Sequence, residues 1–327
     1  MKKVLLATTV LAGFAGAAVA QDATKVKLSG YGRFGIVHNS NAGAGAASSV
    51  IVTRMRLNFD ASVTVDSGVE FGGRIRMQST NVDHGATLND AQLHASYQGL
   101  RVEVGNSNTA YDSAALMFDS EMGFTDSSFG DPTEPTFYYN STPSDNLFVV
   151  QPVLPPFPVG RAANGHMGVF VSYSVGDFNG MLSYVNPDQT VSSLPVGTSS
   201  ESSVAADYKF GQFKVSAAYT HNGAGVTGVN ATFVGASYAI NDVANVGLNY
   251  FDEGASGFKT KTTTLYGNYK MDALTLRGYV ANQKFVSTNT AIGIGADYDL
   301  GGARLSGSIQ RGYANQTVVD LGVRFDF

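Results

Sequence analysis

Short segments in which apolar and polar residues alternate recur along most of the chain, and they limit the fold more than any other feature. In the last segment Val319, Leu321 and Val323 share one side of the chain, while Asp320 and Arg324 share the other. A period of two is typical of a β-strand with one apolar and one polar face. The pattern therefore predicts an all-β protein.

Sixteen segments of this kind follow one another, joined alternately by tight turns and longer polar loops. Glycine, asparagine and aspartate in the tight turns supply the positive φ that two-residue hairpins require. Tight turns at one end and longer loops at the other are typical of an up-and-down outer-membrane barrel. The expected strands are residues 26–37, 50–64, 69–80, 88–97, 100–106, 166–175, 178–185, 203–210, 212–221, 231–240, 243–251, 260–271, 273–283, 291–299, 302–311 and 316–327.

The charged residues lie on the face opposite the aliphatic residues, and this separates a membrane barrel from a soluble one. A soluble barrel fills its interior with large apolar side chains, and a face with this many arginines and aspartates could not line a dry core. The charged face must therefore meet water inside a lumen. The apolar face then meets lipid, where open sheet edges are not tolerated. The prediction is a closed, sixteen-stranded antiparallel transmembrane β-barrel.

Tyrosines near the strand ends support this orientation. Eight of them lie on the apolar face, as in the aromatic girdles of outer-membrane barrels, although tyrosine is also common in strands generally. They are Tyr97, Tyr173, Tyr184, Tyr208, Tyr219, Tyr250, Tyr269 and Tyr298.

The first twenty residues predict a cleaved signal peptide. Lys2 and Lys3 precede a short apolar run, and Ala18-Val19-Ala20 is an A-x-A cleavage site. The mature domain is then residues 21–327, and its net charge changes from −5 to −7 when the two lysines are removed. The chain has no cysteine, so disulfides and thiolate metal sites are excluded. Its mild acidity argues against nucleic acid as a partner.

The alternation stops over residues 106–165, which form a long insertion between two strands. The insertion carries several acids and a proline cluster at Pro152, Pro155, Pro156 and Pro158. A structureless loop of this length in a compact domain is usually functional. We therefore expect it to fold into the lumen and constrict the pore.

Five stretches carry a family resemblance: Val26-Lys27-Leu28-Ser29-Gly30, Asp66-Ser67-Gly68-Val69-Glu70-Phe71-Gly72, Gly123-Phe124-Thr125-Asp126, Ala296-Asp297-Tyr298-Asp299-Leu300-Gly301-Gly302 and Asp320-Leu321-Gly322-Val323-Arg324-Phe325-Asp326-Phe327. With them, the whole mature chain resembles the general porins of Gram-negative bacteria, especially the alphaproteobacterial sixteen-stranded type described from purple photosynthetic bacteria. The insertion departs from that family by being longer and richer in proline.

The resemblance implies an outer-membrane homotrimer, exported through the periplasm, in contact with outer-membrane lipid and lipopolysaccharide. It implies passive diffusion of ions and small hydrophilic solutes, with the third loop folded into the barrel. It also implies that the terminal Phe327 is read as a signal by the outer-membrane assembly machinery.

The pore chemistry follows from the charges on the lumenal face. Sixteen strands enclose a lumen too wide for side chains to fill. Five arginines on the first three strands would form a basic wall, and acids of the insertion would face it across a constriction with a transverse field. Alternatively, the arginines are solvated residues away from any constriction. The basic wall is Arg33, Arg54, Arg56, Arg74 and Arg76, and the acids are Asp112, Asp119, Glu121 and Asp126.

Other functions remain open from sequence. The same four acids could offer hard oxygen ligands to Ca²⁺, although their spacing is not that of an EF-hand and a solvated acidic loop is the alternative. An enzyme is disfavoured, because none of the five histidines stands in a hydrolase motif and no G-x-S-x-G or H-E-x-x-H is present. A substrate-specific channel for anions or sugars is the main competitor, since lumenal basic residues suit anions. The opposing acids and the absence of tryptophan favour a general pore. A structural barrel plugged by the insertion is a third class.

Overall fold

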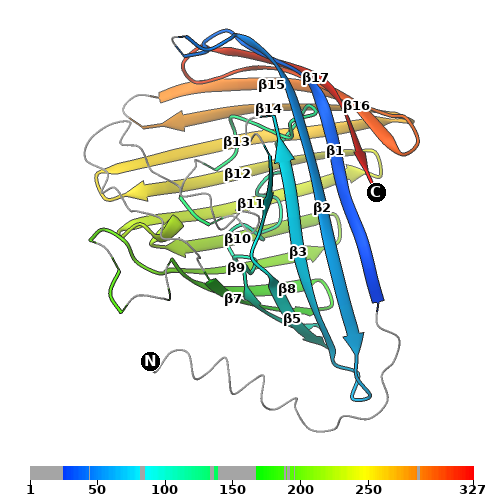
Figure 1. Cartoon of the computed structure of the whole chain (residues 1–327). Coiled ribbons are helices and arrows are strands. Elements are labelled where there is room, and N and C mark those ends of the chain that lie inside the picture. Colours follow the sequence, from blue (N-terminus) through cyan, green and yellow to red (C-terminus); the bar gives the residue numbers. More distant parts are fainter. Residues whose placement is uncertain are drawn as a thin grey trace.

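The protein is described by a computed structural model that covers residues 25–43, 45–81, 85–132, 136–138, 167–187, 189, 192–194, 196–285 and 288–327. Its strands form a single closed, antiparallel sheet (Figure 1). Three sequence-based predictions lie outside the described residues, wholly or in part. They are the signal peptide, the proline cluster of the insertion, and the remainder of the insertion beyond residues 106–132 and 136–138.

The predicted strands are confirmed, with small differences at their ends. The strands are β1 (Lys25–Asn39), β2 (Ser49–Thr64), β3 (Glu70–Thr80), β4 (Ala86–Leu88), β5 (Gln92–Tyr97), β6 (Leu100–Gly105), β7 (Met167–Val175), β8 (Phe178–Asn186), β9 (Glu201–Phe210), β10 (Phe213–His221), β11 (Val229–Asn241), β12 (Ala244–Ala255), β13 (Phe258–Met271), β14 (Leu274–Lys284), β15 (Thr288–Asp299), β16 (Ala303–Arg311) and β17 (Thr317–Asp326). A short 3₁₀ turn, η1 (Gly223–Gly225), precedes β11. None of the described residues forms a helix long and apolar enough to cross a membrane.

The fourth predicted strand is the one difference in strand count. It is interrupted, and its two pieces β4 and β5 both pair with β3, so the barrel has sixteen strands in all. The register shifts by one residue across the break, because Met77 faces Leu88 while Arg74 faces Gln92. One extra residue on one strand of a pair is a β-bulge, which bends the strand locally.

The first and last strands close the barrel. β1 pairs with both β2 and β17, and the backbone of Phe327 exchanges hydrogen bonds of 2.8 and 3.0 Å with that of Gly30. The shared register places Arg33 opposite Arg54 on one side and opposite Arg324 on the other. Closure therefore removes the open edges and sets three arginines side by side on the inner face.

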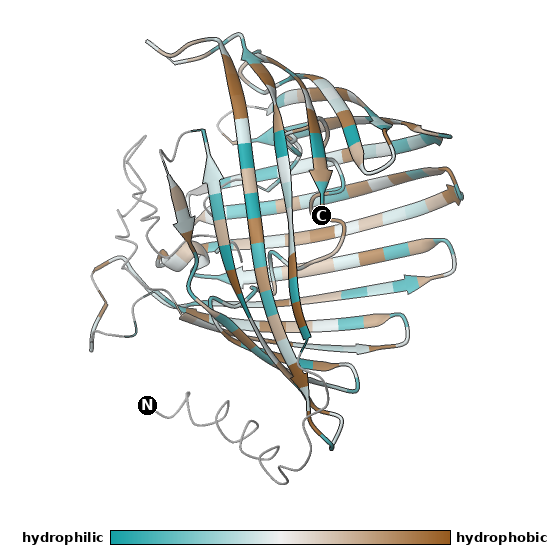
Figure 2. Ribbon diagram, turned by 45° about the vertical axis from the view of Figure 1, so that its right-hand side comes forward, coloured by the Kyte–Doolittle hydropathy of each residue, from teal (hydrophilic) through white to brown (hydrophobic). Residues whose placement is uncertain are grey.

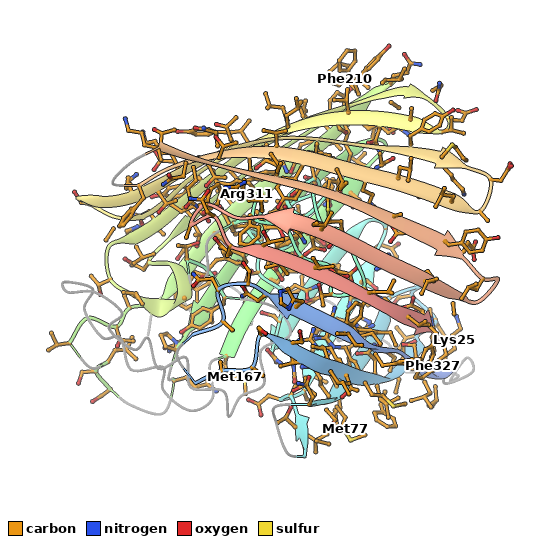
Figure 3. The ribbon with its side chains drawn as sticks, turned by 90° about the horizontal axis from the view of Figure 1, so that it is seen from above. Lys25, Met77, Met167, Phe210, Arg311 and Phe327 are labelled. Carbon is orange, nitrogen blue, oxygen red and sulfur yellow. The ribbon has the colours of Figure 1, made fainter. Side chains whose placement is uncertain are left out.

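The outer face is apolar, as predicted. Apolar and polar residues alternate along the strands (Figure 2), and the eight girdle tyrosines are all 37–49% exposed. Near the turn between β9 and β10, Phe210 points outward (Figure 3) and stacks on Phe213, with ring centroids 5.4 Å apart. The main buried apolar cluster lies instead between the insertion and the inner wall, where Tyr111 and Met117 pack near Phe233 and Phe251. The apolar outer surface suits contact with lipid, and part of the inner wall packs against the insertion.

Candidate functional site

The described part of the insertion, residues 106–132 and 136–138, folds inside the barrel and is called the inner loop below (Figure 1). Polar side chains of the wall hold its start. Ala110 N donates to Ser183 Oγ at 2.9 Å, and Ala115 N donates to Asp207 Oδ1 at 3.0 Å. A loop brought into a lumen must satisfy its backbone polar groups. Short polar side chains on the inner face of β8 and β9 do this.

The middle of the inner loop is fastened in the same way to the next strands. Asn249 Nδ2 donates to Leu116 O at 2.6 Å, and Thr264 Oγ1 donates to Gly130 O at 2.8 Å. Phe129 is held twice, because its N donates to Tyr279 OH at 3.1 Å and its O accepts from Tyr313 OH at 2.6 Å. The loop is therefore attached along a continuous part of the wall.

The tip of the inner loop is fixed to β17. Phe124 N donates to Oδ1 of Asp320 at 2.9 Å, and Asp320 is only 3% exposed. Gly123 adopts φ +73°, and a Cβ there would stand 2.3 Å from the Asp320 carboxylate oxygens. The tip therefore requires glycine both for its left-handed backbone and for its close approach to the wall.

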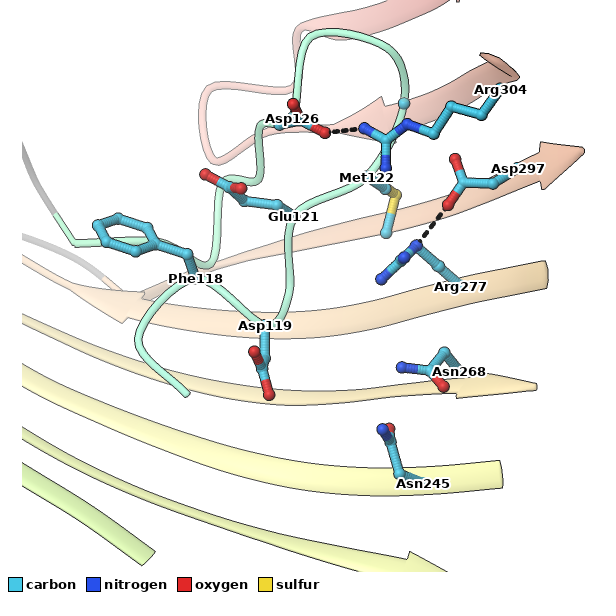
Figure 4. Close-up of a pocket in the computed structure, with 11 residues that line it drawn as sticks. Phe118, Asp119, Glu121, Met122, Asp126, Asn245, Asn268, Arg277, Asp297 and Arg304 are labelled. Atoms are coloured by element: carbon cyan, nitrogen blue, oxygen red, sulfur yellow. Dashed lines mark hydrogen bonds and ion pairs between the residues drawn. The ribbon is translucent and has the colours of Figure 1, made fainter. Parts of the chain in front are cut away.

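Asp126, just beyond the tip, lies among three guanidinium groups. It forms ion pairs with Arg304 and Arg324, and its Oδ2 lies 3.7 Å from Arg33 Nη1 (Figure 4 shows the pair with Arg304). Arg33 also donates to the backbone oxygen of Thr125. Several charge-assisted hydrogen bonds to one carboxylate give a strong local attachment. We call this arrangement the tip clamp.

The remaining predicted arginines are held by wall residues rather than by the loop. Arg56 donates to Gln78 Oε1 at 2.6 and 2.9 Å, and Arg76 Nε donates to Asn58 Oδ1 at 3.0 Å. Arg74 Nε lies 2.7 Å from Asp60 Oδ1. Partners on the neighbouring strand orient these side chains along the inner face of β2 and β3. We call these arginines, together with Arg54, the arginine wall.

Tyr31 links this arginine wall to the tip clamp. Arg54 Nη1 donates to Tyr31 OH at 3.4 Å, and the guanidinium carbons of Arg56 and Arg324 lie 5.4 and 4.3 Å from the centre of its ring. Guanidinium groups over an aromatic face are attracted to it. The phenol ring therefore helps to gather like charges that would otherwise repel one another.

The loop acids do not all gather in one place. Asp119 is exposed and accepts a 3.4 Å hydrogen bond from Tyr266 OH, while Glu121 is half-buried. Burial raises the pKa of Glu121, and the nearby carboxylates of Asp131 and Asp126 raise it further. Asp112 lies nearer the start of the loop, within electrostatic range of Glu201 on β9.

The calcium site weighed from sequence has no counterpart among the described residues. Among the described residues, which include all four acids, no group of three or more acidic or histidine side chains is arranged to hold a metal. Asp126 is already surrounded by guanidiniums, and Asp112 stands elsewhere along the loop. Spacing in the sequence could not reveal this, because two of the three partners of Asp126, Arg304 and Arg324, come from the far end of the chain.

Sequence reasoning missed two arginines as partners of the loop. Arg304 and Arg324 hold Asp126, yet only Arg33 of the predicted basic wall contacts it. A signal was present, because both arginines have the lumenal parity and the last strand of a closed barrel must pair with the first.

A closed barrel with an apolar outer face and a polar lumen narrowed by its own third loop defines a diffusion channel of the outer membrane. Residues 7–318 match the family model of the Gram-negative porins. This chain belongs to that family.

Relatives extend the match over nearly the full length. A porin of Fuscovulum blasticum is 42% identical over 306 residues, covering 93% of this chain and 100% of the relative. A porin of Rhodobacter capsulatus is 28% identical over 331 residues, with 93% and 100% covered. A solved triple mutant of the Rhodopseudomonas blastica porin superposes with a TM-score of 0.82 at 40% identity, again covering 93% and 100%. The protein is accordingly a general porin channel of the Gram-negative outer membrane and not an enzyme.

Proposed function

We propose that the narrowest part of the channel, the eyelet, lies between the arginine wall and the inner loop, and that a transverse field across it selects solutes. Arg54, Arg56, Arg74 and Arg76, extended by Arg33, supply the positive side. Asp119 supplies the negative side, and Asp112 continues it along the loop. Glu121, whose pKa is raised to about 9, joins them as a negative charge only at alkaline pH. Polar solutes can align in such a field, whereas an apolar solute must displace oriented water.

One observation carries this proposal: the tip clamp holds the inner loop inside the barrel beside the first strand. Asp126 is held from β1, β16 and β17 at once. Of the other loop acids, Glu121 lies within electrostatic range of Arg33 and Arg324, while the arginines of β2 and β3 keep partners of their own. Asp126 itself is neutralised by its partners, so we assign it an anchoring role rather than a share in the field.

We also propose that the protein is a homotrimer whose subunits meet on the outer face of β1–β3. Tyrosine and tryptophan favour the membrane–water interface. The exposed outer tyrosines span β5 to β15, whereas the exposed side chains on the outer face of β1–β3 include Val26, Leu28, Ile51 and Met55. A large apolar face without exposed tyrosine suits contact with another copy. The signal peptide and the role of Phe327 in assembly remain predictions of the sequence.

The eyelet is tested by neutralising two arginines that the loop does not hold. In Arg54→Gln plus Arg56→Gln, we expect the ratio of cation to anion permeability to rise about threefold, because two fixed positive charges are lost from the constriction. Reversal potentials in planar bilayers under a KCl gradient measure this ratio, and gel mobility without heating reports whether the trimer persists.

The matched control removes the same charge elsewhere in the lumen. Lys214 and Lys270 share the lumenal parity but lie near short turns. Lys214→Gln plus Lys270→Gln should leave the reversal potential nearly unchanged. Equal shifts in both double variants would mean that general lumenal charge, rather than an eyelet, sets selectivity.

A further inference from the structure

The basic residues on the outer face of the described strands are confined to one sector of the barrel. Along β12, β13 and β14, which lie side by side (Figure 1), Leu248, Leu265 and Val280 are 50–52% exposed and mark the outward side. Alternate residues of a strand share a face. By this parity, the outward lysines and arginines of the described strands are Lys259, Lys261, Lys284 and Arg311.

Three of these cations gather around one acid, at the strand ends opposite the tight turns. The pairing register sets Asp252 opposite Lys261, and Lys261 opposite Lys284. The Asp252 carboxylate is shared, because its Oδ1 lies 3.1 Å from Lys259 Nζ and its Oδ2 lies 3.4 Å from Lys261 Nζ. We call these four residues the outer basic patch. Three cations against one carboxylate leave the patch with an excess of positive charge.

Lys261 and Lys284 stand directly opposite each other on neighbouring strands, and like charges in that position repel. The ion pairs that the described residues form leave Lys284 without an acidic partner. Both lysines are exposed, so a ligand can reach them. An anion between the two ammonium groups would replace their repulsion by two attractions. The patch therefore suits an anionic group.

The level of the patch along the barrel favours a membrane lipid over a dissolved anion. Tyr250 is one of the girdle tyrosines on the outer face of β12, and Asp252 follows it by two residues toward the turn into β13. Aromatic girdles mark the membrane–water interface, and the end opposite the tight turns is extracellular. The patch therefore lies at the headgroup level of the outer leaflet, where basic side chains attract anionic headgroups.

The uncharged neighbours of Lys284 narrow the chemistry of that headgroup. Thr288 stands opposite Lys284, and Asn282 Nδ2 donates to Thr290 Oγ1 at 3.3 Å on the same face. Amide and hydroxyl groups both donate and accept hydrogen bonds, which suits the hydroxyl groups of a sugar. Toward the middle of the membrane, Leu265 and Val280 stand opposite each other and present apolar surface to acyl chains.

We propose that the outer basic patch binds the phosphorylated headgroup of a glycolipid in the outer leaflet. One phosphate lies between Lys261 and Lys284, and the acyl chains run along Leu265 and Val280. A lysine ammonium binds phosphate as a point charge, so two lysines on adjacent strands can share one phosphate group. β15, β16 and β17 separate the patch from β1, so the site is independent of the eyelet and of the proposed contact between subunits.

Native mass spectrometry of the full-length protein in detergent, titrated with diphosphoryl lipid A, tests this directly. We expect saturable binding, and about tenfold weaker binding by Lys261→Gln plus Lys284→Gln, which removes both charges that hold the phosphate. Lys261→Arg plus Lys284→Arg keeps the charges and should bind as the unaltered protein does. The matched control Lys214→Gln plus Lys270→Gln removes two lysine charges from the lumenal face and should also leave lipid binding unchanged.

Two further probes separate the charge from the acyl chains and the lipid from a free anion. Phosphatidylcholine has a phosphate and acyl chains but no net charge, so it should bind weakly and equally to all variants. Inorganic phosphate has no acyl chains, so an equimolar amount should leave lipid A bound.

Four results would overturn the proposal. Lipid A could fail to bind saturably, or it could bind the Lys261 and Lys284 glutamine variant as tightly as the unaltered protein. Phosphatidylcholine binding as tight as that of lipid A would refute the charge argument, and displacement by inorganic phosphate would assign the lysines to a dissolved anion. None of these measurements depends on current through the pore, so their failure would leave the eyelet proposal standing.

Discussion

Two parts of the inner face of the barrel carry side chains of different size and charge. Along β1–β3 the inward residues are long and cationic, as at Arg54 and Arg74. Along β9–β11 the inner wall beneath the loop includes three small residues, Ala205, Ala218 and Ala231, which are buried against it. The inner loop packs against the second region, whereas in the first region the arginines of β2 and β3 are held by other wall residues.

The sizes of the inward side chains therefore indicate which part of the wall the loop packs against. A loop can pack closely only against a wall whose side chains leave room, and its backbone needs nearby polar partners. Alanine, serine and threonine meet both needs, as the contact of Ser183 with Ala110 N illustrates. Along β2 and β3 the inward arginines leave no such room, and wall residues hold them rather than the loop.

The largest expected effect comes from neutralising Asp126, which attaches the loop tip to β1, β16 and β17. In Asp126→Asn, three guanidiniums lose their shared carboxylate, and the docking of the tip should weaken by on the order of 3 kcal/mol. We expect a lower thermal unfolding midpoint and noisier single-channel current, because the loop samples undocked positions. Bilayer recording and circular dichroism on heating measure the two effects.

Asp326→Asn is the matched control. Asp326 lies 3.1 Å from the same Arg324, but its side chain is 66% exposed whereas that of Asp126 is 24% exposed. An exposed pair contributes about 0–1 kcal/mol, so this variant should resemble the unaltered protein. Equal losses in the two variants would contradict the assignment of Asp126 as the anchor.

A smaller effect is expected at the glycine of the tip. Gly123 and Gly228 have similar φ values, +73° and +81°, but a Cβ at Gly228 meets nothing within 4 Å. Gly228→Ala should therefore cost about 1 kcal/mol from the left-handed backbone alone. Gly123→Ala should cost about 2 kcal/mol because the methyl group also meets Asp320, and only this variant should raise single-channel conductance. Unchanged conductance in Gly123→Ala would show that the tip does not limit the pore.

Much of the fold could be predicted because its signals are local. Alternation fixes which face each strand residue occupies, and turn residues mark the ends, so sixteen strands and the lumenal parity of Arg33 follow from the sequence alone. The break between β4 and β5 could not be predicted in this way. It depends on a register shift of one residue relative to β3, which appears only when the strands are paired.

The sequence shows the charged residues of the candidate site but not their partners. The arginines and the loop acids carry visible charge, but pairing Asp126 with Arg324 requires knowing that the last strand closes on the first. Asp112 shares the loop with Asp126, yet it lies near Glu201 because the loop runs along the wall rather than across it at that point. The small residues beneath the loop, such as Ala218, are the signal that would have placed its path.

The smallest effect concerns Asp131, which belongs to the loop side of the comparison. Its Oδ1 accepts from Ser120 Oγ at 2.9 Å, and burial raises the pKa of Asp131 above the ordinary value of an aspartate. The folded protein therefore holds this proton more tightly than the unfolded chain does. The contribution of Asp131 to stability is therefore fully present at low pH. It is lost as the pH rises above the ordinary carboxyl pKa toward the raised pKa of the folded state.

Asp131→Asn cannot lose that proton, so its stability should not fall with this titration. Between about pH 5 and about pH 9 we expect the variant to gain on the order of 1 kcal/mol relative to the unaltered protein, as measured by thermal unfolding at each pH. Glu121 shares the buried environment and interacts with Asp131, so part of the pH dependence should remain in the single variant. Asp242→Asn, at an exposed tight turn, is the control and should change the pH profile little. A pH profile of Asp131→Asn identical to that of the unaltered protein would mean that this carboxylate is already ionised when the loop packs against the wall.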